Sequence, residues 1–116
     1  MKTFKFKSRW GDEYEIRFVK TKYSMDGNLA ILAENLEPEF GWWEPYGNLT
    51  VNLGGDLNGW MGYLDTNNVP DLCDFAIEHG WCTVVGYERS GFCTYPLVVF
   101  TSEFLEEICE VEACAR

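Results

Sequence analysis

The chain contains few residues that could support nucleophilic or metal chemistry. Its 116 residues include a single histidine, His79, and five cysteines that form no Cys-x-x-Cys pair. Nucleophilic catalysis requires a base beside a Ser or Cys, and a structural zinc ion requires several His or Cys ligands at short spacing. The sequence therefore predicts no catalytic residue, no metal site and no cofactor.

Two other kinds of site draw on acidic or glycine-rich segments, which the chain does have. Any two of the nineteen Asp and Glu residues could form the carboxylate pair that hydrolyses a glycoside. This possibility stays open, because a sequence does not give the distances between carboxyl groups. Residues 54–59 are glycine-rich but lack the Lys-Ser/Thr of a phosphate-binding loop. Asp56, Asn58 and Asp65 could offer oxygen ligands to calcium, but they do not follow the EF-hand spacing. A bend between strands is the favoured interpretation of this segment.

Residues 102–114 predict an amphipathic helix that begins with Ser102 as its N-cap. Its apolar stripe consists of Phe104, Leu105, Ile108 and Val111. Side chains three and four residues apart on a helix are neighbours, so the opposite face should carry a dense acidic patch. This patch consists of Glu103, Glu106, Glu107 and Glu110. It indicates either a solvated face or a surface that complements a basic partner.

Residues 37–47 combine two prolines, two glycines and four aromatic residues and follow neither a helical nor a strand period. We therefore expect a loop. Aromatic side chains often supply the buried contacts of protein interfaces. Trp42, Trp43 and Tyr46 are the residues that we expect to anchor a protein partner.

Charge is distributed unevenly along the chain. Residues 1–22 have a balance of +4 and residues 23–116 a balance of −14, which together give the net charge of −10. No Lys or Arg occurs between residues 23 and 88, where eleven acids lie. We expect part of this negative field to be uncancelled at the surface, where it favours either solubility or binding to a basic partner.

Seven segments have the alternation, or the β-branched and aromatic content, of strands. They are residues 3–8, 13–19, 29–36, 48–53, 61–63, 82–87 and 94–101. Gly11 and the Asp26-Gly27 dipeptide predict turns after the first and second strands, and Pro96 predicts an edge or a bulge in the last one. The Ala and Leu content of residues 29–36 also leaves a helix open there.

Residues 69–79 predict a second helix with clear signals at both ends. Asn68 can cap it, Pro70 suits its first turn, and Gly80 can end it. Together with the acidic helix, these elements predict a single α+β domain over residues 1–116. We expect a mainly antiparallel sheet of five or six strands with two helices packed on one face.

The sequence also bears on the compartment. No apolar run approaches the roughly 18 to 20 residues of a membrane span, and the N-terminus lacks the apolar core of a secretory signal. We therefore expect a cytoplasmic protein that binds no membrane. In a reducing compartment an odd number of cysteines should remain as free thiols. These are Cys73, Cys82, Cys93, Cys109 and Cys114.

Three motifs in the second half of the chain suggest a relationship. They are Tyr63-x-Asp65-Thr66-Asn67-Asn68-x-Pro70, Phe75 followed by Gly80, and Ser90-Gly91-Phe92-Cys93-x-Tyr95-Pro96-Leu97-x-x-Phe100. This pattern resembles an uncharacterised family of small acidic proteins associated with conjugative elements and phages of gut Firmicutes. The Ser-Gly-Phe-Cys-x-Tyr-Pro run is its most specific part. The resemblance implies a mobile-element setting, in which small acidic proteins such as anti-CRISPR proteins disarm host nucleases, and it implies no reaction or cofactor.

These observations favour a non-enzymatic acidic inhibitor that binds a nucleic-acid-handling host defence protein. The partner would be a CRISPR effector or a restriction enzyme, bound by mimicry of DNA. The alternative is a protein-interaction adaptor that uses the aromatic loop, and a small hydrolase with a convergent polar pocket comes third. Repulsion between phosphates and the acidic remainder argues against direct binding of nucleic acid by the basic N-terminal segment. The oligomeric state stays open.

Overall fold

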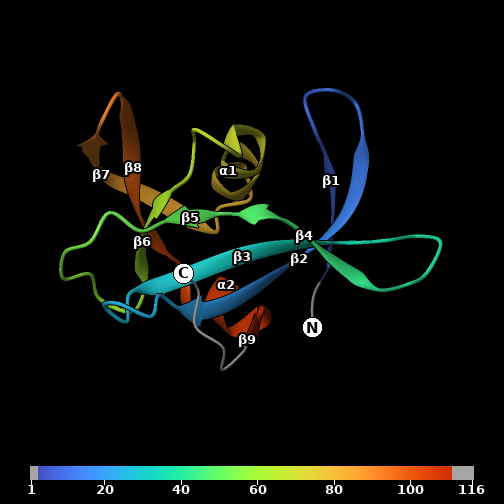
Figure 1. Ribbon diagram of the computed structural model, residues 1–116, viewed down its shortest axis with the longest axis horizontal. Helices are drawn as coiled ribbons and strands as arrows, with labels where there is room; N and C mark the ends of the chain where they lie inside the picture. The colour runs from blue at the N-terminus through green and yellow to red at the C-terminus, as the bar shows by residue number, and fades with distance from the viewer. Residues whose placement is uncertain (1–2, 111–116) are drawn as a thin grey trace.

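The computed structural model describes residues 3–110, with side chains described through Ile108 (Figure 1). The strands in this part of the chain are β1 Phe4–Lys7, β2 Glu13–Lys22, β3 Leu29–Leu36, β4 Trp43–Asn48, β5 Thr50–Val51, β6 Met61–Leu64, β7 Cys82–Ser90, β8 Cys93–Phe100 and β9 Cys109–Glu110. The helices are α1 Pro70–Glu78 and α2 Ser102–Glu107. Neither described helix is long and apolar enough to cross a membrane. The expectations for Val111 and for the thiols of Cys109 and Cys114 lie outside the described residues.

The first sheet has the strand order β1-β2-β3-β4, and all three of these pairings are antiparallel. β2 and β3 form its longest ladder, from Ile16 opposite Asn35 to Lys22 opposite Leu29. The turn between them contains Gly27 with a φ of 72°, as the Asp26-Gly27 pair predicts. Residues 29–36 are therefore a strand rather than a helix.

The second sheet has the order β5-β6-β8-β7 and is also antiparallel. β7 and β8 form a hairpin whose last pair is Ser90 opposite Cys93, so the turn has two residues, and Gly91 has a φ of 62°. Pro96 pairs with Tyr87 of β7 and lies beyond residues 97–99, which pair with β6. The N–H that proline lacks therefore costs the β6 ladder nothing.

The expectation of one sheet is wrong, because the predicted strand at residues 48–53 divides at Leu49. Leu49 is fully buried, its N–H donates to the carbonyl of Ile31 (2.9 Å), and its carbonyl accepts from the N–H of Asp65 (2.9 Å). The chain leaves the first sheet at the end of β4 and enters the second at β5. Alternation in sequence reports extended backbone, but it does not report which strand lies beside it.

α1 agrees with its prediction except at its start. Val69 occupies the N-cap position without a side-chain cap, and the amide of Asn68 donates instead to Asp65 Oδ2 (2.9 Å). At the other end, the N–H of Gly80 donates to the carbonyl of Ile77 (3.0 Å), and Gly80 has a φ of 71°. A glycine in the left-handed region ends the helix as predicted.

The prediction of a helix over residues 102–114 is wrong in its length. α2 ends at Glu107, and Ile108 is extended and buried. β9 follows and pairs in parallel with Val19 and Lys20 of β2. β1 covers this edge of β2 only as far as Ile16, so the remaining edge has backbone groups that β9 can satisfy. The N-cap is Thr101 rather than Ser102, since Thr101 Oγ1 accepts from the N–H of Phe104 (3.1 Å).

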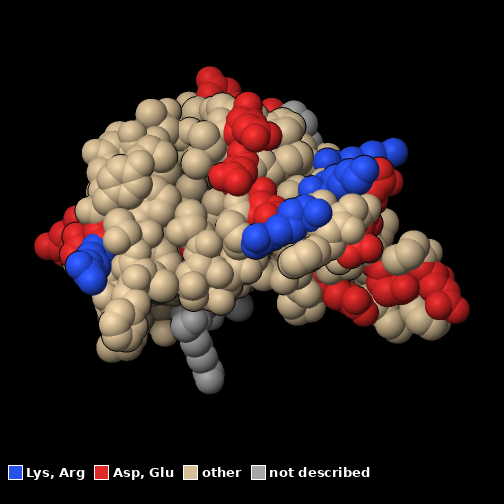
Figure 2. Space-filling view, turned by 90° about the horizontal axis from the view of Figure 1, so that it is seen from above, with Lys and Arg blue, Asp and Glu red and all other residues tan. Residues whose placement is uncertain are grey.

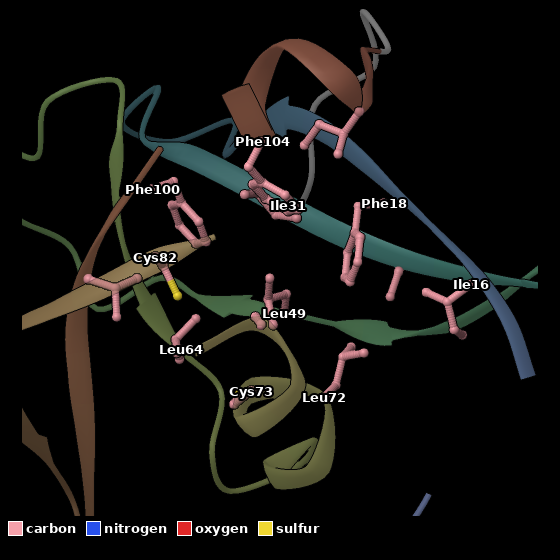
Figure 3. Packing of buried hydrophobic residues seen from close by; sticks show 14 of the residues in the cluster. Ile16, Phe18, Ile31, Leu49, Leu64, Leu72, Cys73, Cys82, Phe100 and Phe104 are labelled. Atoms are coloured by element: carbon pink, nitrogen blue, oxygen red, sulfur yellow. The ribbon is translucent and has the colours of Figure 1, made fainter. Parts of the chain in front are cut away.

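The core lies between the two sheets and reaches both helices (Figure 3). Phe18 and Ile31 of the first sheet face Leu49 and Leu64, and all four side chains are fully buried. In Figure 3, α1 and α2 lie at opposite ends of this core. Both pack on the same face of the first sheet, because Phe75 of α1 contacts Phe6 and Phe104 of α2 contacts Phe18. The mainly antiparallel α+β character of the domain is confirmed.

Candidate protein-binding surface

The tip of the β3–β4 hairpin, residues 37–42, is closed by its own hydrogen bonds. The N–H of Glu37 donates to the carbonyl of Trp42 (2.8 Å), and the N–H of Gly41 donates to the carbonyl of Glu37 (2.8 Å). Glu37 Oε2 also accepts from the N–H of Phe40 (2.6 Å). Gly41 has a φ of 75°, a conformation that side chains disfavour. The tip therefore has a defined backbone shape before any partner binds.

The second half of the predicted loop is strand β4. Its register shifts between Ala33 and Glu34 of β3, opposite Gly47 and Pro45 respectively, so Tyr46 is the extra residue of a bulge. β4 is the last strand on its side of the sheet, and proline is tolerated on an edge strand. Prolines and glycines at residues 37–47 conceal this strand in the sequence.

Two aromatic side chains project from the tip and stack on each other. The rings of Phe40 and Trp42 have centroids 4.6 Å apart and an interplanar angle of 14°. Phe40 is 61% exposed and Trp42 is 53% exposed. The indole Nε1 of Trp42 donates to Glu44 Oε1 (3.0 Å), which holds the ring in place. Phe40 is absent from the predicted anchors, although its i, i+2 spacing from Trp42 across a glycine could have indicated it.

The other two predicted anchors have structural roles. The guanidinium of Arg17 lies 4.5 Å from the ring centroid of Trp43, and Arg17 Nε pairs with Glu34 Oε1 at 2.6 Å. Tyr46 is half-buried, and its ring contacts those of Tyr14 (5.0 Å) and Phe6 (5.9 Å). Burial raises the pKa of the Tyr46 phenol. Of the three predicted anchors, only Trp42 is therefore displayed for a partner.

Three carboxylates belong to the tip and the start of β4: Glu37, Glu39 and Glu44. None of them forms an ion pair with the part of the chain that the structure describes. In Figure 2, Asp and Glu side chains gather at the right-hand tip of the molecule, at the end where Figure 1 places the β3–β4 turn. A band of Lys and Arg lies beside them, over the region of the β1–β2 hairpin. The tip combines an apolar centre with a negative rim.

The predicted glutamate face is not formed as a unit. Glu103, Glu106 and Glu107 are exposed on α2, but Glu110 lies in β9, where it is the register partner of Lys20. Lys20 Nζ donates to the carbonyl of Leu105 (2.7 Å), so a basic side chain lies at the end of this helix. The six-residue helix therefore presents three of the four predicted acids, close to a lysine.

Tertiary structure also cancels part of the acidic charge. Arg9 pairs with Asp71 of α1, with its Nε 3.1 Å from Oδ1 and its backbone N–H 2.8 Å from Oδ2. Arg17 pairs through its Nε with Glu34, its register partner across β2 and β3. Both acids belong to the segment that contains no base of its own. The uncancelled negative charge that we expect therefore comes only from acids without an ion pair, and these include the acids of the β3–β4 tip.

The structure also places His79 and the Ser90 to Cys93 segment, the two other candidates from the sequence. His79 follows α1, its Nδ1 lies 2.8 Å from the carbonyl of Phe75, and its ring lies against those of Phe75 and Trp81. Among residues 3–110, no group of three or more His, Cys, Asp or Glu side chains could hold a metal ion. Ser90 to Cys93 form the β7–β8 turn, and Phe92 is fully exposed there.

Comparisons with known proteins give one match. A family model described as a domain of unknown function, DUF4313, matches residues 19–114. No curated protein and no solved structure matches the chain. The matched range includes the β3–β4 tip and the Ser90 to Cys93 turn, and it leaves out β1 and the first six residues of β2.

Proposed function

The chain belongs to the DUF4313 family, and we propose that it is a non-catalytic protein-binding domain whose β3–β4 tip engages a basic surface of a protein partner. The exposed stack of Phe40 and Trp42, held within a closed tip, supports this function most directly. Aromatic side chains with few rotatable bonds bury a large area at a low entropic cost. A tip whose backbone is already hydrogen-bonded has less freedom to lose on binding.

The charge of the tip supports a basic partner. Glu37, Glu39 and Glu44 belong to the tip and the start of β4 and have no ion pair in the described chain. Unpaired charges around an apolar centre accelerate association with a surface of opposite charge and disfavour partners of like charge. Proteins that handle nucleic acid carry such basic surfaces, because they neutralise phosphates with Lys and Arg.

The partner that this surface fits best is therefore a nucleic-acid-binding protein. Inhibition of a host defence nuclease, either a CRISPR effector or a restriction enzyme, is the form of this function that agrees with the mobile-element resemblance. Mimicry of DNA by a row of four glutamates loses its basis, because Glu110 is not on α2. An adaptor that binds the same partner without blocking its activity is the second form. The two forms share the tip and differ only in the consequence of binding.

A comparative capture experiment tests the surface. The immobilised protein, a Phe40→Ala/Trp42→Ala variant and a Trp10→Ala control are exposed to lysate of the host, and bound proteins are quantified by mass spectrometry. Trp10 is exposed on the β1–β2 turn and serves as a matched aromatic control. We expect a nucleic-acid-binding protein to be retained by the wild type and by Trp10→Ala but lost from the double variant. Equal retention by all three proteins would contradict the proposal.

Binding kinetics with the purified partner then show how the tip contributes to binding and whether the tip or α2 is the binding surface. Glu37→Gln/Glu39→Gln/Glu44→Gln should slow association and weaken its dependence on salt, whereas Trp42→Ala should mainly accelerate dissociation. Glu103→Gln/Glu106→Gln/Glu107→Gln places the same number of neutralised charges on α2. If that variant rather than the tip variant slows association, α2 is the binding surface and the proposal is wrong. Loss of the partner's nucleic-acid binding in the complex identifies an inhibitor, and unchanged binding identifies an adaptor.

A further inference from the structure

A pocket of about 550 Å³ opens where the β2–β3 turn meets the chain crossing between the two sheets. Its lining includes Tyr23, Met25, Asn48, Thr50, Asn52 and Asp65. Small-molecule sites in proteins commonly have volumes of about 300 to 1,000 Å³ and combine apolar walls with a few polar groups. This pocket has those proportions, and it lies apart from the β3–β4 tip.

Hydrogen bonds fix one wall of the pocket. The hydroxyls of Tyr23 and Thr50 are 2.9 Å apart, and Thr50 Oγ1 also accepts from the N–H of Ile31 (3.0 Å). Tyr23 and Thr50 are both buried. Only one of their two hydroxyl hydrogens can lie in the bond that joins them. The other is left to donate, whichever residue carries it.

A network of amides and backbone groups fixes Asn52, another residue of the lining. Asn52 Nδ2 donates to Asp26 Oδ2 (2.9 Å), and Asn52 Oδ1 accepts from the N–H of Gly54 (3.1 Å). Asn28 Nδ2 donates to the carbonyl of Gly55 (3.0 Å) and lies 3.4 Å from Asn52 Oδ1. The side chain of Asn52 is therefore held in one orientation, which reduces the ordering that a ligand must impose.

Asp65 is the most unusual group in the lining. It is only 7% exposed, and its carboxylate accepts hydrogen bonds from the backbone N–H (3.2 Å) and the side-chain amide (2.9 Å) of Asn68. Both donors are neutral. A buried carboxylate is ordinarily paired with a cation, but no basic side chain of the described chain pairs with Asp65. Each of its oxygens retains a lone pair for another donor.

The remaining chemistry of the lining favours binding over catalysis. Burial raises the pKa of the Tyr23 phenol, so this group stays protonated at neutral pH and acts as a hydrogen-bond donor rather than a base. None of the described residues that line the pocket is Lys, Arg or His. An anion would therefore meet Asp65 without a compensating charge, whereas a cation would supply the partner that this carboxylate lacks.

We propose that this pocket binds a small organic cation that donates N–H bonds to Asp65 and lies beside the Tyr23–Thr50 hydroxyl pair. The apolar part of the ligand would lie against Tyr23 and Val51, and Met25, which is exposed at the rim, can adjust to its shape. Amidines and primary amines with a flat apolar body belong to this class. The proposal is independent of the function of the β3–β4 tip.

Three probes of the same size test the pocket by NMR titration of the unmodified ¹⁵N-labelled protein. Benzamidine carries a positive charge, benzamide is neutral and benzoate is negative. We expect benzamidine to shift the amide signals of residues 48–52 and 65 in a saturable manner, benzamide to bind more weakly and benzoate not to bind. Equal binding of benzamidine and benzoate, or no saturable shift with benzamidine, would overturn the proposal.

Matched variants then test whether Asp65 is the acid that binds the cation. Asp65→Asn should weaken benzamidine binding by about tenfold or more, which is the effect of removing one charge-assisted hydrogen bond. Asp74→Asn neutralises an exposed acid of α1 outside the pocket and should leave binding unchanged. Unchanged affinity in Asp65→Asn would overturn the assignment. Circular dichroism shows whether Asp65→Asn folds, and the three-probe comparison on the unmodified protein decides the proposal if it does not.

Discussion

The indole ring of Trp81 stacks on the phenyl ring of Phe104, with centroids 5.1 Å apart and an interplanar angle of 20°. Trp81 also contacts the rings of Phe4 (4.4 Å), Phe18 (5.5 Å) and Phe75 (5.3 Å). Phe104 belongs to α2 and Phe75 to α1, whereas Phe4 and Phe18 belong to β1 and β2 of the first sheet. One side chain in the connection between α1 and β7 therefore joins both helices to the first sheet.

Replacement of Trp81 should be among the most destabilising changes in the chain. Trp81→Ala removes a half-buried ring with contacts to four elements, and we expect a loss of about 3–5 kcal/mol in the free energy of unfolding. Trp81→Phe keeps part of the stack and should cost less. Urea denaturation measures both, with the exposed Trp10→Ala as a control that stays within about 0.5 kcal/mol of the wild type. A similarly small effect of Trp81→Ala would show that the aromatic cluster is not central to stability.

Adjacent tryptophans should separate stability from binding. Trp43 lies against the guanidinium of Arg17, whereas Trp42 is at the exposed tip. We expect Trp43→Leu to lower the free energy of unfolding by about 1–2 kcal/mol through the lost cation–π contact and burial. Trp42→Leu should change it by less than about 0.5 kcal/mol. Chemical denaturation of the two variants provides the measurement, and equal effects would mean that Trp42 is also part of the fold.

The position of the α2 N-cap gives a sharp comparison between neighbours. Thr101 Oγ1 accepts from the N–H of Phe104, whereas Ser102 is already within the helix and exposed. Thr101→Ala should cost about 1 kcal/mol of stability because that N–H loses its acceptor. Ser102→Ala should be close to neutral. Thermal unfolding of both variants checks this, and the reverse order would place the cap at Ser102.

Thiol reactivity should divide the described cysteines. Burial raises the pKa of Cys73 to about 12 and that of Cys82 to about 11, so almost none of either is thiolate at pH 8. Cys93 is only half-buried. We expect iodoacetamide to modify Cys93 first and the other two only after unfolding, because thiolate is the reactive form. Peptide mass spectrometry measures the order, and rapid modification of Cys73 in the folded protein would contradict it.

The local sequence pattern was sufficient to predict where most of the strands and helices lie. Alternation of apolar and polar residues places β1 and β2, and the Pro70 and Gly80 signals bracket α1 within two residues. These features depend on neighbours a few positions away, so a sequence can report them. The same pattern failed at Leu49 and at Ile108, where an extended chain changes its hydrogen-bonding partner or a helix gives way to a strand. Those outcomes depend on which sheet edge is open, and that edge is distant in sequence.

The sites depended still more on tertiary structure. Composition alone located the aromatic segment and the acidic excess, but it could not show that Trp43 and Tyr46 pack inward while Phe40 joins Trp42 outside. It also could not show that Arg9 and Arg17 neutralise Asp71 and Glu34. Exposure and ion pairing are set by contacts between residues far apart in the chain. The pocket beside Asp65 has the same origin, because its lining residues meet only where the two sheets join.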